Sequence, residues 1–503
     1  MERRAFFKLV GAGAVVAAGG GLAACSSGAV PSPLAPAAPT EEEGPRVFES
    51  PDVSFSSDVD VLVVGSGIAG LSAAMAPLEA GRSVMIAEKL ELLGGESYSS
   101  TGVMHVSGSA LQKQAGIETT AEQAWDTRRQ EFADAGITDL DFAKRLFVTA
   151  PAWVDHLVDE YGAQFENPAD HVKAGASERI LLPKRGLGDM ESIMTPLRDG
   201  LSSKGAAFAT GLRASAFVVD ASGTVCGMRL RDAKTGAATD VRARAVVMAT
   251  GGFASSQPLV HANVPAQERI GCYTIASMGE GQLLCAHLGG QLDDMGKAAP
   301  LTSDLPEAAA WGLFGPVLVV DALGRRFARE DDPNVAADAC VVGDRGYWWT
   351  IFGKKLSSGA QARSIAQVTT KNAKRLAGPF DDVEALAGGL GIASDALKAV
   401  FDGYGEAVDA GKDDAFGRTA FLQEIEPPYY ALKQLPVRYK TRGGVRTDAD
   451  GRLLNAAGSA IANVYACGSV AAGSVEGLAT NGAFGLIVGR ALAKVLDEGD
   501  AGE

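Results

Sequence analysis

Residues 58–88 follow the strand–turn–helix–strand pattern of a dinucleotide-binding unit. Residues 58–64 form an apolar stretch of strand length, and the glycine-rich turn GSGIAG follows directly at 65–70. An alanine-rich helix then leads to a second apolar stretch, 83–87, which ends at the acidic residue Glu88. Because a helix that connects two parallel strands places them in one sheet, this pattern predicts a Rossmann-like α/β domain.

Each glycine of this turn has an expected role. Gly65 permits the tight turn, Gly67 lets the backbone approach a pyrophosphate, and Gly70 lets the helix pack on the strand. The helix that begins at Ile68 and Ala69 offers backbone N–H groups and the positive end of its dipole to the phosphates. Glu88 can accept hydrogen bonds from a ribose diol.

The segment after Glu88 favours FAD over NAD as the dinucleotide. It contains Lys89, the Gly-Gly-Glu-Ser run at 94–97 and the Ser-Ser-Thr-Gly run at 99–102. Small and hydroxyl residues at this point suit a loop that runs beneath a long, extended cofactor.

Composition and charge exclude several classes of protein. The chain has 503 residues, of which 47% are hydrophobic, which is enough for a buried core and argues against wholesale disorder. Its net charge of −15 argues against a dedicated nucleic-acid binder, which needs a basic face. The six cysteines form no CxxC pair and the five histidines show no metal-ligand spacing, so we expect no metal site.

The first 25 residues are typical of an export signal. Arg3 and Arg4 precede Phe-Phe-Lys and then an uncharged stretch rich in Gly and Ala, residues 9–24. This predicts a twin-arginine signal, and Leu-Ala-Ala before Cys25 resembles a lipobox, in which Cys25 would carry a lipid. An ordinary secretory signal is the alternative. Residues 26–57, rich in Ser, Pro, Ala and Glu, are expected to form a flexible tether.

Further motifs extend over residues 57–497. They are a hairpin around Val218, ATGGF at 249–253, GEG at 279–281, GRRF at 324–327 with Glu330, GKD at 411–413 with FGR at 416–418, PPYYA at 427–431, GG at 443–444 and YACG at 465–468. In this order they resemble the flavoprotein family of soluble fumarate reductases, flavocytochrome c, urocanate reductases and 3-ketosteroid dehydrogenases.

The resemblance implies FAD as cofactor and two domains in an α/β fold. A discontinuous, Rossmann-like FAD-binding domain would cover 58–296 and 437–498, and an inserted α+β capping domain would cover 297–436. Within the insert, Ser394 is expected to cap a helix with a core-facing stripe: Leu397, Val400, Phe401, Tyr404 and Val408. Cys467 is expected to be a small packing residue and not a redox thiol.

The turn motif, the following loop and the resemblance together give a set of FAD-binding candidates. They are Gly65, Gly67, Ile68, Ala69, Gly70, Glu88, Lys89, Gly95, Glu96, Ser97, Thr101, Gly102, Val218, Ala249, Thr250, Gly251, Gly468, Ser469, Asn481, Gly482, Ala483, Gly485 and Leu486.

The family chemistry is hydride exchange between flavin N5 and a C=C or CH–CH bond. Fumarate reductases of the family add a cationic clamp, but this chain has Lys440 where they have a His and Thr480 where they have an Arg. Glu330 remains, without the arginine that follows it in the proton route. Because a buried dicarboxylate needs cationic partners, fumarate is not the expected substrate, and a neutral, larger or aromatic molecule is favoured.

Three residues are candidates to bind the carbonyl oxygen of a conjugated alkene: Tyr430, Lys440 and Arg442. The alternative is that Tyr430 belongs to the core and that Lys440 and Arg442 pair with acids on the surface.

The resulting hypothesis is an exported, FAD-dependent ene-reductase for a small organic molecule. The alternatives are oxidation as in 3-ketosteroid dehydrogenases, or a lipid-anchored flavin protein that only relays electrons. Because the chain has no haem motif, we expect an external electron donor such as a membrane or surface cytochrome. The expected location is the outer face of the cytoplasmic membrane through Cys25, or the periplasm or cell surface.

Overall fold

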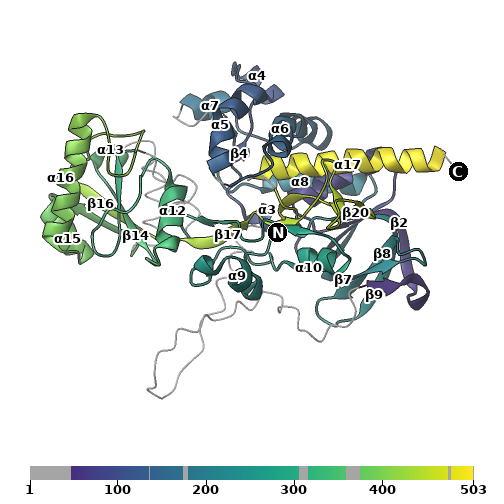
Figure 1. Ribbon diagram of the computed structural model, residues 1–503. Coiled ribbons are helices and arrows are strands. Elements are labelled where there is room, and N and C mark those ends of the chain that lie inside the picture. Colours follow the sequence, from purple (N-terminus) through teal and green to yellow (C-terminus); the bar gives the residue numbers. More distant parts are fainter. Residues whose placement is uncertain are drawn as a thin grey trace, which may run out of the picture. The chain divides into compact units, whose positions relative to one another are not determined.

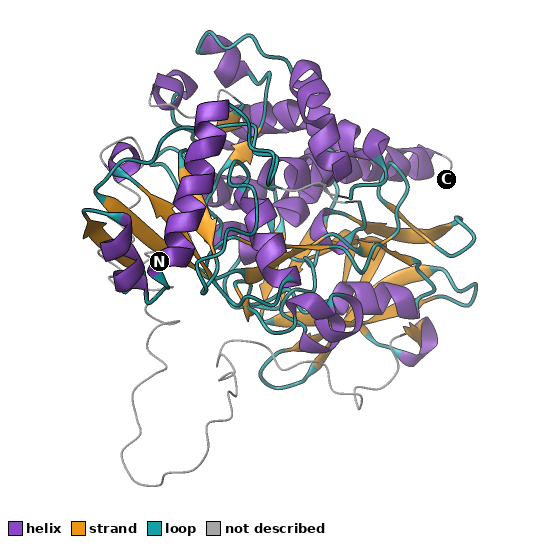
Figure 2. Cartoon of the chain, turned by 60° about the vertical axis from the view of Figure 1, so that its left-hand side comes forward, coloured by secondary structure: helices purple, strands orange, loops and turns teal. Residues whose placement is uncertain are grey.

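The computed structural model describes residues 47–134, 136–173, 179–304, 315–357, 374–473 and 477–501. The export signal and lipobox predicted at 1–25 lie outside the described residues. The mixed α/β character of the described part is visible in Figure 2, where strands are orange and helices purple.

A nine-stranded sheet forms the centre of the dinucleotide-binding part. Strands β2 (Phe55–Val64), β3 (Val84–Glu88), β6 (Ala207–Thr210), β9 (Ala238–Met248) and β20 (Ala460–Ala466) pair in parallel. The register aligns their carboxyl ends, because Val64 lies opposite both Ala87 and Met248, and Met248 lies opposite Ala466.

The same sheet also contains antiparallel pairs. Strand β7 (Leu212–Val219) pairs with β8 (Val225–Asp232), β8 pairs with β9, and β19 (Arg452–Leu454) pairs with β20. The predicted Rossmann-like fold is confirmed.

The folded part begins earlier than the sequence suggested. Residues 47–57 were assigned to the tether, but β1 (Val47–Glu49) pairs in parallel with β7, and β2 already starts at Phe55. The guanidinium of Arg229 lies 4.0 Å from the ring centroid of Phe48, and that of Arg242 lies 4.3 Å from the ring of Phe55. Cation–π contacts with the sheet thus hold a segment whose composition suggested only a linker.

Helices α2 (Ile68–Glu79) and α17 (Leu478–Ala501) pack closely on one another. Figure 1 shows α17 as the long yellow helix beside α6 (Leu140–Tyr161). A Cβ on Gly485 would stand 2.1 Å from the carbonyl oxygen of Ala69, so only glycine permits this approach. Trp153 of α6 donates a 2.8 Å hydrogen bond to Ser72 and fills the space beside Gly482.

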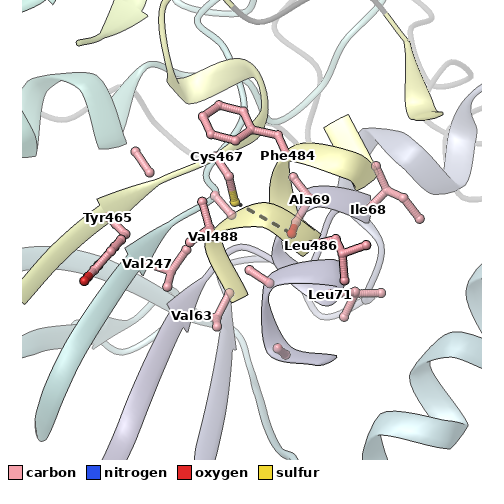
Figure 3. Packing of buried hydrophobic residues seen from close by; sticks show 14 of the residues in the cluster. Val63, Ile68, Ala69, Leu71, Val247, Tyr465, Cys467, Phe484, Leu486 and Val488 are labelled. Carbon is pink, nitrogen blue, oxygen red and sulfur yellow. Dashed lines mark hydrogen bonds between the residues drawn. The ribbon is translucent and has the colours of Figure 1, made fainter. Parts of the chain in front are cut away.

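Cys467 lies in this core and acts as a packing residue, as expected (Figure 3). Its thiol donates to the carbonyl oxygen of Ala69 over 3.7 Å, and the side chain is fully buried. Burial raises the pKa of the Cys467 thiol to about 12, so the reactive thiolate is disfavoured.

A second sheet, of four strands, belongs to the inserted segment. Its order is β13 (Val317–Val320), β14 (Trp348–Phe352), β16 (Tyr429–Gln434) and β15 (Leu376–Phe380). The chain enters this segment after β12 (Ala298–Leu301) and leaves it at β17 (Val437–Thr441), and these two strands pair antiparallel.

Among the described residues of the insert, the helices are α12 (Pro333–Val342), α13 (Lys354–Ser357), α15 (Val383–Leu390) and α16 (Ser394–Ala410). The expected stripe on α16 is confirmed, since Leu397 and Tyr404 are buried against the sheet. The expected cap is wrong: the N-cap is Ala393, whose extended backbone precedes the helix and whose side chain cannot accept a hydrogen bond.

Four buried charges connect two of the sequence motifs in the insert. Arg326 binds Glu330 with two 2.7 Å contacts and reaches Asp413 at 2.6 Å, and Arg418 lies 3.3 Å from Glu330. Arg418 also donates to the carbonyl oxygen of Val317 at 2.7 Å. Two cations and two anions thus neutralise one another. They tie the loop after α16 to the four-stranded sheet of the insert, which we call the capping sheet. Glu330 is therefore part of a structural network.

The close packing of α17 on α2 gives a stability test. Gly485→Ala should lower the free energy of unfolding by about 1–3 kcal/mol, because the added methyl group would overlap backbone. Gly403→Ala in α16, where a Cβ would meet nothing within 4 Å, is the matched control and should raise it by about 0.5–1 kcal/mol. Urea unfolding of the flavin-free variants measures both, and equal effects of the two would contradict the packing argument.

Candidate active site

One pocket lies at the aligned carboxyl ends of the parallel strands. Val64 is the last residue of β2 and Gly65 follows it, Glu88 ends β3, Ala249 follows β9, and Gly468 comes after β20. Ligands of open α/β sheets bind at this edge, because the loops there are free to open around them.

The three glycines of the turn have distinct surroundings. Gly65 has a φ of +107°, and a Cβ there would stand 2.3 Å from the carbonyl oxygen of Ala249. A Cβ on Gly70 would stand 2.0 Å from the carbonyl oxygen of Gly65. Gly67, with a φ of −64°, would meet only Ser97 Oγ at 3.5 Å, so this position faces the pocket. Gly65 and Gly70 therefore serve the turn and the packing, and Gly67 leaves room for a ligand.

Glu88 organises the turn as well as facing the pocket. Its Oε2 accepts hydrogen bonds from Ser66 N at 3.1 Å and Ser66 Oγ at 2.7 Å, and its Oε1 accepts from Leu90 N at 3.0 Å. Ser66 Oγ in turn accepts from Gly94 N at 2.8 Å. The buried Ser66 thus joins the turn to the following loop, a role that the sequence pattern did not reveal.

The loop after β3 folds over the start of α2. Helix α3 (Gly95–Ser99) places Gly95, Glu96 and Ser97 in the pocket wall, and Ser97 Oγ accepts a 3.0 Å hydrogen bond from Ile68 N. Thr101 also lines the pocket. Gly102 does not: a Cβ there would stand 2.6 Å from Pro183, so this glycine serves packing.

A charged cluster lines the wall between α10 (Glu280–His287) and β7. Lys89 Nζ forms an ion pair with Glu280, and Arg213 Nη1 lies 3.6 Å from Glu280 Oε1. Arg213 was missed because the sequence pointed to Val218 on the same strand. Val218 is fully buried between β1 and β8, so this candidate is corrected: Leu212–Ala214 at the other end of β7 line the pocket.

The C-terminal candidates divide into two groups. Gly468, Ser469 and Asn481 line the pocket, as do Thr250 and Gly251 from the turn after β9. Four others do not line it, because they pack α17 against its neighbours. They are Gly482, Ala483, Gly485 and Leu486.

The wall of the pocket also contains cationic and aromatic residues. Lys440 and Arg442 line it from β17 and the residues after it, and Arg128 lines it from α5 (Ala121–Asp134). The rings of Tyr273 and Tyr439 meet edge to face there, with centroids 5.6 Å apart. Arg128 and the tyrosines were missed, because only folding brings these segments to one place.

Tyr430 is corrected as a site candidate. It lies in β16 of the capping sheet, where its ring stacks on Phe352 at a centroid distance of 5.5 Å, and it does not line the pocket. Tyr430 of β16 lies directly opposite Phe352 of β14. Because residues opposite one another in a sheet point to the same face, the Tyr430 side chain lies on the apolar face that carries Phe352.

The pocket fits a dinucleotide. The N-terminus of α2 opens into it, and Gly67 leaves space at that point. Two buried atoms of its wall, Thr250 Oγ1 and Glu96 Oε1, have no hydrogen-bond partner among the described residues. Such atoms are costly unless a ligand binds them, so the wall suits a polar, extended molecule.

The protein-family model described as "FAD binding domain" matches residues 60–486. The chain belongs to this family. FAD is therefore the cofactor, and the protein is an FAD-dependent oxidoreductase acting on CH–CH or C=C bonds. The family and the cofactor inferred from the motifs are confirmed.

Curated relatives include enzymes of both reaction directions. A urocanate reductase of Eggerthella lenta is 28% identical over 439 residues, which cover 83% of this chain and 70% of the relative. A 3-oxosteroid 1-dehydrogenase of Mycobacterium tuberculosis is 24% identical over 82% of this chain and 93% of its own length.

Solved structures agree on the fold. The open conformation of a flavocytochrome c3 fumarate reductase matches with a TM-score of 0.67 and 26% identity, over 88% of this chain and 79% of that one. A 3-ketosteroid dehydrogenase from Rhodococcus jostii matches with a TM-score of 0.71 at 22% identity, over 89% of this chain and 99% of that one.

The described residues lack two further kinds of feature. They contain no helix with the length and apolar character that a membrane crossing requires. They also contain no cluster of three or more His, Cys, Asp or Glu side chains arranged to hold a metal ion.

The contrast between Gly67 and Gly70 gives a test of the roles assigned to the glycines of the turn. Gly67→Ala should leave the unfolding of the flavin-free protein nearly unchanged but weaken FAD binding, because its methyl group enters the ligand space. Gly70→Ala should instead lower the free energy of unfolding by about 1–3 kcal/mol, since its methyl group meets backbone. Urea unfolding and FAD titration of both variants separate the two effects. Equal loss of stability in both would contradict the assignment.

Proposed function

We propose that this protein is an exported ene-reductase that uses FAD to reduce a C=C bond conjugated to a carbonyl or carboxylate group. The main supporting observation is that the glycine-rich turn at 65–70 and the residues Lys440 and Arg442 line the same pocket. Bound FAD would supply the hydride chemistry at this junction.

Lys440 and Arg442 have the chemistry to bind the oxygen of the substrate. Reduction of a conjugated alkene moves negative charge onto that oxygen, and fixed cationic donors stabilise the charge as it develops. Both residues come from the segment that includes β17, whose pairing with β12 and β10 (Gly271–Cys272) holds its backbone in place. Preorganised donors lower the barrier because they need no reorientation during the reaction.

The rest of the wall supports a planar substrate other than fumarate. Tyr273, Tyr439 and Phe132 provide aromatic surface for a flat, apolar part of the molecule. Thr480 replaces an arginine expected of a fumarate clamp, and this loss of a cation supports a substrate with a single polar end. The relative that carries the name urocanate reductase is consistent with this choice.

The electrons are proposed to come from an external cytochrome. Similar proteins include one named fumarate reductase (cytochrome) of Shewanella frigidimarina, 27% identical over 82% of this chain. The proposed location follows from the signal at 1–25: export by the twin-arginine route, to the outer face of the cytoplasmic membrane through a lipid on Cys25, or to the periplasm or cell surface.

The activity is tested by anaerobic flavin reoxidation. The purified flavoprotein is photoreduced and mixed with α,β-unsaturated acids, ketones or steroids, and the flavin absorbance is followed. Reoxidation by an unsaturated acid or ketone is the expected result. If none reoxidises the flavin and saturated 3-ketosteroids reduce the oxidised protein instead, the direction of the reaction is that of a dehydrogenase.

Once a substrate that reoxidises the flavin is known, substitutions test the roles of Lys440 and Arg442. Lys440→Gln and Arg442→Gln should each lower kcat/KM by about 10- to 100-fold, the cost of one hydrogen bond to a charged group. Tyr430→Phe is the control and should leave kcat/KM unchanged, since Tyr430 packs in the capping sheet. Unchanged kcat/KM in both cationic variants would contradict the assignment.

Export is tested with the paired arginines. A variant carrying Arg3→Lys and Arg4→Lys should retain the flavoprotein in the cytoplasm, and Lys8→Arg, in the same segment, should not. Cys25→Ser should leave export intact and release the protein from the membrane fraction. Unchanged export of the double-arginine variant would exclude the twin-arginine route.

A further inference from the structure

Helix α5 carries one cation in an otherwise apolar stripe. The residues of this stripe follow helical spacing, and Ala124, Trp125 and Phe132 are at most 7% exposed. Arg128 occupies the position between Trp125 and Phe132 in the same stripe and is half-buried, whereas the neighbouring Arg129 is exposed. An apolar residue would satisfy the packing at position 128, so an arginine there indicates a role besides packing.

Aromatic packing holds the Arg128 side chain in place. Its guanidinium carbon lies 5.0 Å from the ring centroid of Phe132. Phe132 stacks on Trp125 at a centroid distance of 5.4 Å and meets Phe147 of α6 at 6.1 Å. Because these three rings are buried, the cation–π contact fixes the cation against a rigid surface.

Arg128 lines the same pocket as Arg442. A Cβ on Gly136, just after α5, would stand 3.9 Å from Cδ of Lys297. The carbonyl oxygen of Lys297 accepts a 2.8 Å hydrogen bond from the backbone N–H of Arg442. The end of α5 therefore lies beside the segment that carries Arg442, and two distant parts of the sequence supply arginines to one pocket.

A guanidinium beside an aromatic ring favours one class of ligand. The parallel N–H donors of an arginine match the two oxygens of a carboxylate and bind a neutral ketone or amide less strongly. The ring of Phe132, which also lines the pocket, suits a flat apolar group next to that carboxylate. Lysines and arginines outnumber carboxylates in the pocket wall, which favours an anionic ligand further.

We propose that Arg128 determines substrate specificity by binding a carboxylate group conjugated to the C=C bond. The protein then prefers a planar unsaturated acid to the neutral ketone or amide of the same shape. This inference rests on the proposed function for the C=C bond and narrows its substrates from carbonyl or carboxylate compounds to acids. It assigns the selection to a helix outside the insert.

Ligand binding to the oxidised flavoprotein tests the proposal without turnover. Matched pairs of an acid and its primary amide are added to the protein with FAD bound: crotonate and crotonamide, cinnamate and cinnamamide, and 3-(2-naphthyl)acrylate and its amide. A ligand that binds beside the flavin changes the flavin absorbance, and the titration gives its Kd. The natural chain should bind at least one acid about 10- to 100-fold more tightly than its amide, as expected of hydrogen bonds to a charged group.

Adjacent arginines on α5 supply the variant and its control. Arg128→Met places a flexible apolar side chain in the apolar stripe, so the fold should be retained. This variant should lose the preference for the acid and bind the amide as the natural chain does. Arg128→Lys keeps the charge without the paired donors and should restore only part of the preference. Arg129→Met removes the same charge one residue away and should keep the full preference.

Titration of the flavin-free variants with FAD separates a substrate role from a cofactor role. The Kd for FAD should be the same for the natural chain and Arg128→Met. The proposal is overturned if no acid binds more tightly than its amide, if Arg128→Met keeps the preference, if acid and amide lose affinity equally, or if the variant binds FAD more weakly.

The inference and the proposed function can fail separately. The binding titrations require no reduction of the ligand, so selection of acids by Arg128 would stand even if the flavin exchanged hydride in the direction of a dehydrogenase. Reoxidation of the reduced flavin by neutral ketones alone would leave the ene-reductase function standing and would overturn the inference about Arg128.

Discussion

The alignment of the carboxyl ends of β2, β3, β9 and β20 is the constraint on which the rest of the structure depends. Backbone hydrogen bonds continue this alignment beyond the strands, from Gly65 N to Ala87 O and from Cys467 N to Met248 O. The loops that follow these strands come from distant parts of the sequence and therefore line one pocket together. The close approach of Gly65 to Ala249 leaves no room for a side chain, so glycine at this turn is a condition of the alignment.

Charge is distributed differently in the two parts of the molecule. In the insert, two buried arginines and two buried acids neutralise one another and fasten a loop to the sheet. In the pocket, cations exceed acids at the Lys89–Glu280–Arg213 cluster, and Lys440 and Arg442 also line the wall. A chain of net charge −15 thus contains a locally cationic cavity, which suits an anionic cofactor and a substrate oxygen that gains charge.

The sequence predicted the features that depend on local backbone conformation. The roles of Gly65, Gly67 and Gly70, the two strands around them and the helical stripe of α16 all follow from residue spacing within one element. The failures concern register and tertiary contact. Val218 was chosen on the right strand but at its buried end, and Tyr430 lies in a strand of the insert, where its ring stacks on Phe352. Arg213 carried no local signal, because only the pairing of β7 in the sheet brings it to Glu280.

The short strand β1 has a consequence for how the protein behaves in solution. It occupies the outer side of β7, at the end of the main sheet, where unpaired N–H and C=O groups would otherwise form a template for another chain. A strand of only three residues, fixed by the contact of Phe48 with Arg229, covers this border and itself offers little length for further pairing. The segment before the Rossmann unit thereby protects the sheet against edge-to-edge aggregation.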